Sequence, residues 1–343
     1  MAVLHFESDY LEGAHPLILE RLTQTNFEKT PGYGLDEYSD AARTKIRSAC
    51  GCPEAGVWFL EGGTQTNATV IDGLLRTFEG VVAAQTGHIN VHEAGAIEAA
   101  GHKVLAIPQH NGKITAEDLT KYLDLFNNDS SRDHEVIPGM VYISHPTEYG
   151  TLYTSDELTS LSRICRSHKL PLYLDGARLG YGLAADNTGI TLEKIAQLCD
   201  VFYIGGTKVG ALFGEAVVVT KPELIPHFFT IIKQHGALAA KGRILGIQFD
   251  TLFSNNLYFK ISRNAIETAM IIRNGLQKKG YTFYLDSPTN QQFIIIEDTK
   301  LKQLESTVGF STWERYDEAH TVIRLATSWA TKKEDVEELL KQF

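Results

Sequence analysis

The sequence predicts an α/β fold built around a mostly parallel central sheet. Short apolar runs alternate with helical patterns along the first 220 residues or so, which is the order that parallel sheets require. Two of these runs, Leu172–Leu174 and Val201–Ile204, are short and bounded by polar or glycine residues, as buried parallel strands are. The chain has 343 residues, 43% of them hydrophobic, which allows one large domain and a smaller one.

The large domain is predicted over residues 16–240, after an N-terminal arm of residues 1–15 that is too short and polar to be a core element. Apolar residues recur at helical spacing, for example at Ala42, Ile46 and Ala49, and glycines mark the turns. The predicted helices are 16–25, 38–49, 68–78, 94–100, 116–126 and 156–168, with a polar loop at 127–134. The predicted strands are 57–60, 81–84, 104–107, 140–143, 172–174 and 201–204.

The pattern changes after residue 225, and a small α/β domain is predicted over residues 241–343. Segments 225–232 and 237–253 have helical patterns, and a long helix is expected over 262–279. Strands at 281–285, 292–296, 312–313 and 322–325 and helices at 301–307 and 333–342 complete a unit that packs back on the large domain.

Charge and composition narrow the class of protein. A formal net charge of −10 argues against nucleic acid and anionic membranes as partners. The N-terminus lacks the basic region and apolar core of a signal peptide, and no apolar run approaches the roughly 20 residues needed to cross a bilayer. The four cysteines do not have zinc-type spacing, so we expect reduced thiols, no metal and a cytoplasmic location.

Three charged side chains follow two neighbouring predicted strands. Asp175 ends the first strand, with Arg178 three residues on, and Lys208 follows Gly205-Gly206 at the end of the second. Because open α/β sheets bind ligands at the carboxyl ends of their strands, these groups are expected to converge. A buried lysine amine and an acid suit pyridoxal phosphate (PLP), which bonds to the lysine and pairs its ring nitrogen with the acid. The alternatives are a structural ion pair for Asp175 and Arg178 and a solvated surface position for Lys208.

Two upstream motifs fit the same cofactor. In Gly62–Asn67, glycines and a helix N-terminus can cradle a phosphate, although the motif matches no nucleotide fingerprint; Thr64 as a plain helix N-cap is the alternative. His88 follows another strand and can stack on a flat aromatic ring. His88 and His92 also have the i, i+4 spacing of metal ligands on a helix, and we favour stacking over metal binding.

A dispersed set could contact a substrate. Ser8 lies in the arm, Tyr33 lies between two glycines, and Arg324 interrupts an apolar strand. A buried arginine needs a partner, which could be a substrate carboxylate or a structural acid.

In chain order, the motifs S-D, Y-G, G-T-Q-x-N, H-x-x-x-x-E-A-G, D-G-A-R, T-K and I-R-L resemble those of the threonine aldolase / aromatic amino acid β-eliminating lyase family. That family consists of PLP-dependent enzymes of fold type I, and the resemblance spans about residues 6–340. It implies a PLP-dependent transferase-like large domain. It also implies a homodimer or homotetramer with sites at the dimer interface.

The resemblance implies roles for individual residues. Lys208, His88 and Asp175 would be catalytic: Lys208 would carry the cofactor, His88 would stack on its ring, and Asp175 would keep the ring nitrogen protonated. Gly63 and Thr64 would hold the phosphate. The cofactor edge and the substrate α-carboxylate would be bound by Arg178, Ser8 and Arg324, and Tyr33 would reach in from a neighbouring subunit.

The implied reaction is cleavage of L-threonine, L-allo-threonine or a related β-hydroxy-α-amino acid to glycine and an aldehyde. Family members have N-T-H where this chain has Pro146-Thr147-Glu148, so the base is left open among His92, His145 and Glu148. The chain also has T-K-V around the lysine where those enzymes have S-K-G.

Other functions use the same residues differently. β-Elimination from an aromatic or sulfur amino acid, or transamination, would keep the lysine, the aspartate and the arginines. A nucleotide-binding module built on Gly62–Asn67, or a non-catalytic protein on a retired enzyme scaffold, explains fewer of the motifs.

Overall fold

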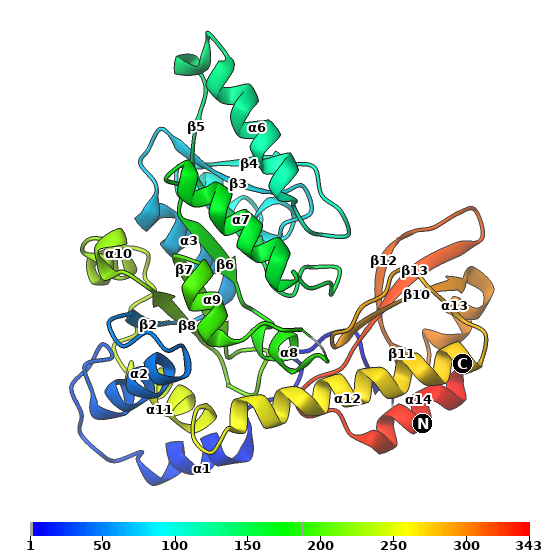
Figure 1. Cartoon of the computed structure of the whole chain (residues 1–343). Coiled ribbons are helices and arrows are strands. Elements are labelled where there is room, and N and C mark those ends of the chain that lie inside the picture. The colour runs from blue at the N-terminus through cyan, green and yellow to red at the C-terminus, as the bar shows by residue number, and fades with distance from the viewer. Residues whose placement is uncertain (1–2, 187) are drawn as a thin grey trace.

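The computed structural model describes residues 3–186 and 188–343 and contains a seven-stranded, mostly parallel sheet (Figure 1). Only β8 runs antiparallel to its neighbours β2 and β7. The predicted α/β class is confirmed. Across the sheet the strands are β2 (Gly56–Leu60), β8 (Glu215–Val219), β7 (Val201–Gly205), β6 (Leu172–Asp175), β5 (Ile137–Ser144), β3 (Glu79–Ala84) and β4 (Lys103–Ile107).

Helices cover both faces of this sheet, because alternate strand residues point to opposite sides and both sides are apolar. One face packs against α3 (Gly63–Leu74), α5 (Ala96–Ala99) and α10 (Phe228–Gln234). The other face packs against α2 (Glu37–Ala49), α6 (Ala116–Asn128), α7 (Ser155–Ser167), α9 (Leu192–Leu198) and α11 (Arg243–Leu252).

A second, antiparallel sheet lies in the C-terminal part, with the order β12 (Ser311–Arg315), β13 (His320–Ala326), β10 (Gln291–Glu297) and β9 (Thr282–Phe283). Helices α13 (Asp298–Leu304) and α14 (Lys333–Gln342) accompany it, and α12 (Leu257–Lys278) runs from the large part to this sheet (Figure 1). Helix α11 packs against α2 and α1 (Pro16–Gln24), on the large part. The boundary between residues 240 and 241 stays a prediction.

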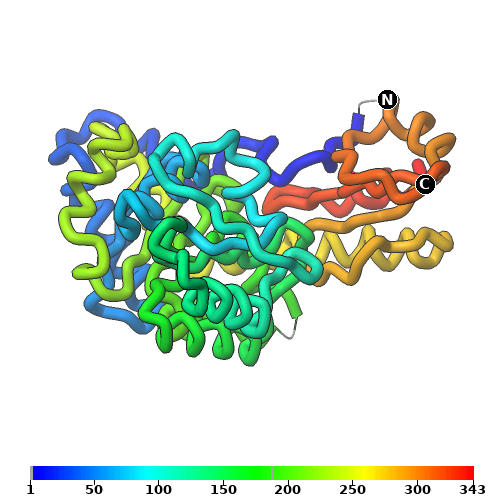
Figure 2. The backbone as a smooth tube through the Cα atoms, turned by 90° about the horizontal axis from the view of Figure 1, so that it is seen from above, coloured from blue at the N-terminus to red at the C-terminus, as the bar shows by residue number. Residues whose placement is uncertain are grey.

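The prediction that the N-terminal arm contributes nothing to a core is wrong. Strand β1 (Leu4–His5) pairs with β11 (Val308–Gly309), and the Phe6 carbonyl accepts a hydrogen bond from the Ala326 amide at 2.8 Å. The Phe6 ring is buried in the C-terminal core, and Asp9 is completely buried. Figure 2 shows the arm lying beside the C-terminal strands before it enters the large part.

Several element boundaries differ from the predictions. Helix α3 begins at Gly63, five residues early, because Gly62 is extended (φ −168°) and its carbonyl already accepts from the Thr66 amide. Thr64 therefore lies inside the helix and is not its N-cap. The apolar run after Gly214 forms strand β8, which the patterns do not predict.

Residues with left-handed backbone set further boundaries. His227 (φ 59°) separates the 3₁₀ turn Pro222–Leu224 from α10, so the helix predicted over 225–232 begins only at Phe228. Asn256 (φ 58°) precedes α12, which starts at Leu257. The patterns do not predict two short helices: α4 (His88–Val91), which precedes α5, and α8 (Leu179–Ala184), which follows β6. The helix predicted over 237–253 is confined to α11. The loop predicted over 127–134 contains a 3₁₀ turn at Arg132–His134.

Among residues 3–186 and 188–343, no helix combines the length and the apolar character needed to cross a membrane.

The backbone at Gly176 lies too close to the neighbouring strand to leave room for a side chain. A Cβ atom at this position would lie 1.9 Å from the Tyr203 carbonyl oxygen. Gly176→Ala is therefore expected to lower the free energy of unfolding by about 1–3 kcal/mol through a forced backbone shift. Thermal unfolding measures this change, with Gly13→Ala as the control because its Cβ would meet no atom within 4 Å. Equal melting temperatures for the two variants would contradict the crowding.

Candidate active site

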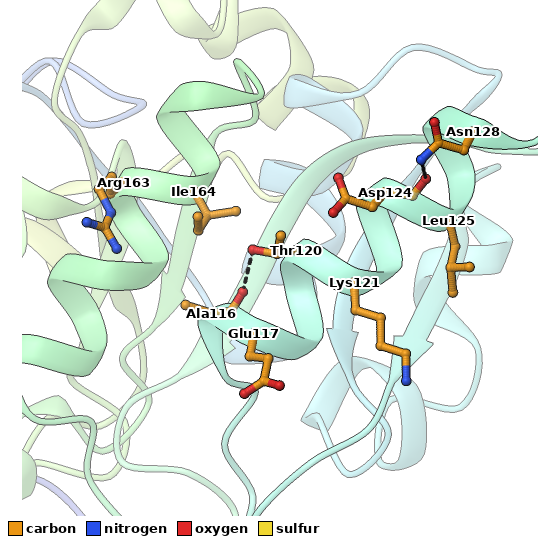
Figure 3. Close-up of a pocket in the computed structure, with 9 residues that line it drawn as sticks. All are labelled: Ala116, Glu117, Thr120, Lys121, Asp124, Leu125, Asn128, Arg163 and Ile164. Carbon is orange, nitrogen blue, oxygen red and sulfur yellow. Dashed lines mark hydrogen bonds between the residues drawn. The ribbon is translucent and has the colours of Figure 1, made fainter.

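A cavity of about 330 Å³ opens at the carboxyl ends of β5, β6 and β7 and brings the predicted groups together. Its lining includes Lys208, Asp175, Arg178, His88 and the Gly62–Thr64 segment. A larger hollow of about 570 Å³ lies elsewhere, between α6 and α7 (Figure 3). None of the predicted site residues lines it, so the sheet edge is the candidate site.

Lys208 is held in this cavity by its backbone and surrounded by protein. The Tyr181 hydroxyl donates to the Lys208 carbonyl oxygen, and the Tyr10 ring centroid lies 5.7 Å from the Lys208 amine. Burial, followed by the nearby Arg178 charge, lowers the pKa of Lys208. A lysine amine that loses its proton more readily is a better nucleophile, so the position favours covalent chemistry.

His88 forms part of a buried polar chain below the cavity. Its Nδ1 lies 2.7 Å from Glu93 Oε1, and the Asn67 side-chain amide donates to the same oxygen at 2.7 Å. Burial opposes protonation of His88, but the hydrogen bond to Glu93 and the charge of Asp175 raise its pKa overall. His92 is exposed, with its ring 5.6 Å from that of His88. The described part of the chain contains no cluster of three or more His, Cys, Asp or Glu side chains suited to a metal.

The N-terminus of α3 faces the same cavity. Gly62 is the N-cap, and no side chain caps the helix. The first amides of a helix lack intrahelical acceptors and carry a positive dipole end. A Cβ at Gly63 would lie 3.3 Å from the Tyr203 hydroxyl, so a glycine lets the backbone sit close to the sheet edge. This twelve-residue helix therefore offers the donors that a phosphate group needs.

The structural ion pair between Asp175 and Arg178, which is the alternative interpretation of these residues, is not present. Instead, the Arg178 guanidinium donates to both carboxylate oxygens of Asp9, at 2.6 and 3.0 Å. Asn290 also donates to Asp9, at 2.9 Å. Although burial alone would raise it, the Arg178 charge lowers the pKa of Asp9 to about 2. Arg178 lines the cavity from a position fixed by the arm.

A second cavity, of about 410 Å³, shares five lining residues with the first, namely Tyr10, His88, Glu148, Arg178 and Lys208. Arg324 lines it, donating to Gln291, to the Glu7 carbonyl and to Ser311, each at 3.1 Å. Its Nε and the Ser8 hydroxyl are buried without a hydrogen-bond partner. Burial lowers the pKa of Arg324 to about 10. No acid forms an ion pair with this half-buried cation in the described residues, so the second cavity suits a carboxylate ligand.

Tyr33 lies away from both cavities of this chain. The residue is 41% exposed, its backbone is left-handed (φ 61°), and the Lys233 amine lies 4.5 Å from its ring centroid. Its predicted contact with a neighbouring subunit's site stays a prediction.

The three candidates for the base occupy different environments. Glu148 lines both cavities; its Oε1 accepts from the Ser144 hydroxyl at 2.6 Å and from the His88 amide at 2.9 Å, and its Oε2 is buried without a partner. Burial raises the pKa of Glu148. His145 lines neither cavity and is fully buried, which lowers its pKa to about 4. His92 lines only the second cavity.

The motifs do not single out every residue that the structure places at the site. Glu215, at the start of β8, lines the first cavity and accepts from the Gly206 amide at 3.1 Å. A charged residue at the start of the apolar run Ala216–Val219 is the signal that could have found it. Three other site residues lie in the quoted motifs or beside them: Asp9 in S-D, Tyr10 directly after it, and Asn67 in G-T-Q-x-N. The spacing of the motifs does not reveal which groups these residues contact.

Comparison with a solved structure shows the fold class of the protein. The aspartate aminotransferase of Thermus thermophilus superposes with a TM-score of 0.73 at 15% identity, covering 99% of this chain and 91% of that one, which shows the fold. The fold is fold type I of the PLP-dependent enzymes, as predicted.

The family follows from the sequence. The model of the beta-eliminating lyase family matches residues 6–299, and the chain belongs to this family. A threonine aldolase structure from Leishmania major is 41% identical, with a TM-score of 0.95 over 98% of this chain and 97% of that one. A low specificity L-threonine aldolase of a Pseudomonas species is 27% identical over 97% of this chain and 95% of its own length.

The buried acid Glu215 is expected to make the stability of the fold depend on pH. Burial raises the pKa of Glu215 from 4.5 to about 8, so between these values the folded protein holds a proton that the unfolded chain has released. Its contribution to stability is thus fully present below about pH 4.5 and is lost as the pH rises through about 8. The gain in stability of Glu215→Gln over the unmodified protein is expected to grow across that window. Denaturant unfolding at several pH values measures it.

The exposed carboxylate Glu117 supplies the control for this experiment. Glu117→Gln should leave the pH dependence of stability unchanged. A Glu215→Gln profile parallel to that of the unmodified protein would show that Glu215 is ionised in the fold.

Proposed function

We propose that the protein is a PLP-dependent carbon–carbon lyase that cleaves L-threonine, L-allo-threonine or a related β-hydroxy-α-amino acid to glycine and an aldehyde. The observation that carries the proposal is the meeting of a half-buried lysine, a buried carboxylate and an uncapped helix N-terminus in one cavity. Relatives named as low-specificity L-threonine aldolases support the reaction.

The donor set fits the cofactor. Lys208 would bind it covalently through its amine, Asp175 would pair with the ring nitrogen, and the amides of Gly63 and Thr64 would receive the phosphate. His88, which lines both cavities, would stack on the ring. When bound, PLP supplies a delocalised system that takes up the electron pair left at Cα as the Cα–Cβ bond breaks.

The chain's own residues would orient the substrate. Arg324 and Ser8 carry unpaired buried donors, and a substrate α-carboxylate would satisfy them. Arg178 donates to Asp9 through its Nε and one terminal nitrogen. Its role would therefore be to hold a positive charge and a fixed side-chain position in the cavity beside Lys208. Holding the carboxylate in one place fixes which bond at Cα faces the cofactor, and such positioning lowers the barrier before any proton moves.

Glu148 is the base that the geometry supports best among His92, His145 and Glu148. Glu148 lines both the cavity that holds Lys208 and the cavity that holds Arg324, and its Oε2 is buried without a hydrogen-bond partner. A carboxylate whose pKa is raised by burial takes a proton from a hydroxyl group more readily than an ordinary one. Glu148 would hold the proton of the substrate β-hydroxyl as the aldehyde leaves.

The oligomeric state and the cellular location can be proposed as well. We propose a homodimer or homotetramer with sites at the dimer interface, where Tyr33 would reach a neighbouring site. Its exposed ring and left-handed backbone in a Gly-Tyr-Gly turn support a contact role. Four free thiols support the cytoplasm as the location.

β-Elimination from an aromatic or sulfur amino acid, or transamination, is the alternative, and the family description favours elimination among these. The two outcomes differ in product, because aldol cleavage gives glycine and an aldehyde whereas elimination gives pyruvate and ammonia.

Replacement of Lys208 tests the proposal as a whole. The purified protein is expected to show an absorbance band near the edge of the visible range, and Lys208→Ala should abolish that band and the activity. Incubation with L-threonine and L-allo-threonine should yield glycine and acetaldehyde. A colourless protein that takes up no PLP would contradict the cofactor. Formation of 2-oxobutyrate and ammonia from threonine, without glycine, would contradict only the reaction.

Replacement of Glu148 tests the base. Glu148→Gln keeps the side-chain size and should lower kcat for L-threonine by about 10²–10⁴-fold, the usual contribution of a general base. The rise of kcat with pH on the acid side, which reflects the loss of the Glu148 proton, should disappear. His92→Gln is the matched comparison: a larger loss of kcat in this variant would assign the base to His92.

A further inference from the structure

Asp175 lies in a ring of hydrogen-bond donors that no motif of the sequence indicates. The Tyr203 hydroxyl donates to Oδ1 at 2.5 Å, and the Ala177 amide donates to the same oxygen at 3.0 Å. The Tyr142 hydroxyl donates to Oδ2 at 2.7 Å, and the Asn67 amide donates to it at 2.9 Å. Each carboxylate oxygen of Asp175 therefore accepts from two protein donors, and any further donor shares an oxygen with them.

The sheet places these groups by its register. Asp175, on β6, lies beside Ser144 on β5, and Tyr142 lies two residues back on the same face. Tyr173 pairs with Val201, which puts Tyr203 level with Asp175 on β7. Each tyrosine belongs to the core between the sheet and α3 and is at most 1% exposed. The two phenols therefore flank the carboxylate from the strands on either side.

A third tyrosine acts through Asn67. The Tyr173 hydroxyl donates to Asn67 Oδ1 at 2.8 Å, which fixes the amide so that its Nδ2 faces both Asp175 and Glu93. The rings of Tyr142 and Tyr173 lie 5.7 Å apart and those of Tyr173 and Tyr203 lie 6.4 Å apart, so the three form one continuous layer. A layer of phenylalanines would fill nearly the same space without any of these hydrogen bonds.

We propose that Tyr142 and Tyr203 are positioning residues that hold Asp175 as an ion and weaken its pull on the proton of the cofactor ring nitrogen. This inference rests on the proposed function, because it concerns PLP bound at Lys208. A nitrogen that approaches Asp175 meets oxygens already engaged by phenols, and hydrogen bonds to a charged acceptor disperse its charge. The strength of the electron sink would then be set by the tyrosine layer as well as by Asp175.

Other charged groups face Asp175 from the surrounding elements. They are His88 and Glu93 beside α4, Glu148 after β5, Lys208 after β7 and Glu215 on β8. Burial alone would raise the pKa of Asp175, but the His88 charge and the hydrogen bonds from Tyr203 and Tyr142 lower it overall. Removing one phenol leaves the other charged groups in place, so a change in Asp175 can be assigned to that phenol.

Tyr203→Phe and Tyr142→Phe test the proposal in the PLP-loaded protein. With ¹⁵N-labelled PLP, the ring-nitrogen resonance of the resting protein is expected to shift toward the unprotonated position in each variant, because Asp175 without one phenol pulls harder on the ring-nitrogen proton. Tyr153→Phe is the control, because Tyr153 is equally buried and its hydroxyl oxygen accepts from the Ile114 amide away from Asp175. An unchanged resonance in both test variants, or an equal shift in the control, would overturn the proposal.

The same variants can be followed without cofactor, which separates this inference from the proposed function. In protein labelled with ¹³C at the aspartate carboxyl, with Asp175→Asn to assign the signal, Asp175 should titrate at higher pH in each Phe variant than in the unmodified protein. Identical titration would overturn the role of the phenols even if PLP binds. Failure to bind PLP together with a shifted titration would overturn the cofactor's part in the proposal and leave the phenols acting on Asp175 alone.

Discussion

The burial of ionised groups at the carboxyl edge of the sheet is the constraint on which the rest of the structure depends. An unpaired charge in a protein interior costs several kcal/mol, so each such group must be surrounded by donors or opposite charges. Asp175 meets this demand with donors from β5, β7 and α3. The layers are thus joined by hydrogen bonds to one carboxylate as well as by apolar packing.

The same constraint explains why the two ends of the chain meet at the site. Arg178 follows β6, and its acid comes from the N-terminal arm as Asp9, which is held in turn by Asn290 beside β10. Arg324 on β13 donates to the Glu7 carbonyl of that arm. A segment of about ten residues therefore connects the central sheet to the C-terminal sheet.

Much of the fold could be predicted because strand–helix alternation and short apolar runs are local signals. Lys208 and Asp175 could be placed at one edge from topology alone, since parallel strands carry their carboxyl ends to the same side. The partner of Arg178 could not, because Asp9 lies 169 residues away in sequence and an acid at Asp175 is much nearer along the chain. The predicted start of α3 is five residues late because Thr64–Asn67 are polar, as loops are. In the structure Thr66 and Asn67 are buried within the helix, and Asn67 donates to Asp175. The left-handed Asn256 sets the start of α12 without a glycine or proline beside it, whereas Pro226 directly before His227 is a signal that the predicted helix over 225–232 overlooked.

The charge balance of the cavities shows why buried acids can line a site for anionic ligands. Lys208, Arg178 and Arg324 bring three positive charges, and Asp9 and Asp175 bring two negative ones. If Glu93, Glu148 and Glu215 were all ionised, the site would repel a phosphate and a carboxylate. Burial raises the pKa of all three acids, in Glu215 to about 8, so Glu215 holds its proton at neutral pH and adds no negative charge to the site. Of the three, only Glu148 also lines the second cavity, so it is the acid placed to take a proton from a bound substrate, while the protonated Glu215 leaves the positive charge that holds an anionic ligand.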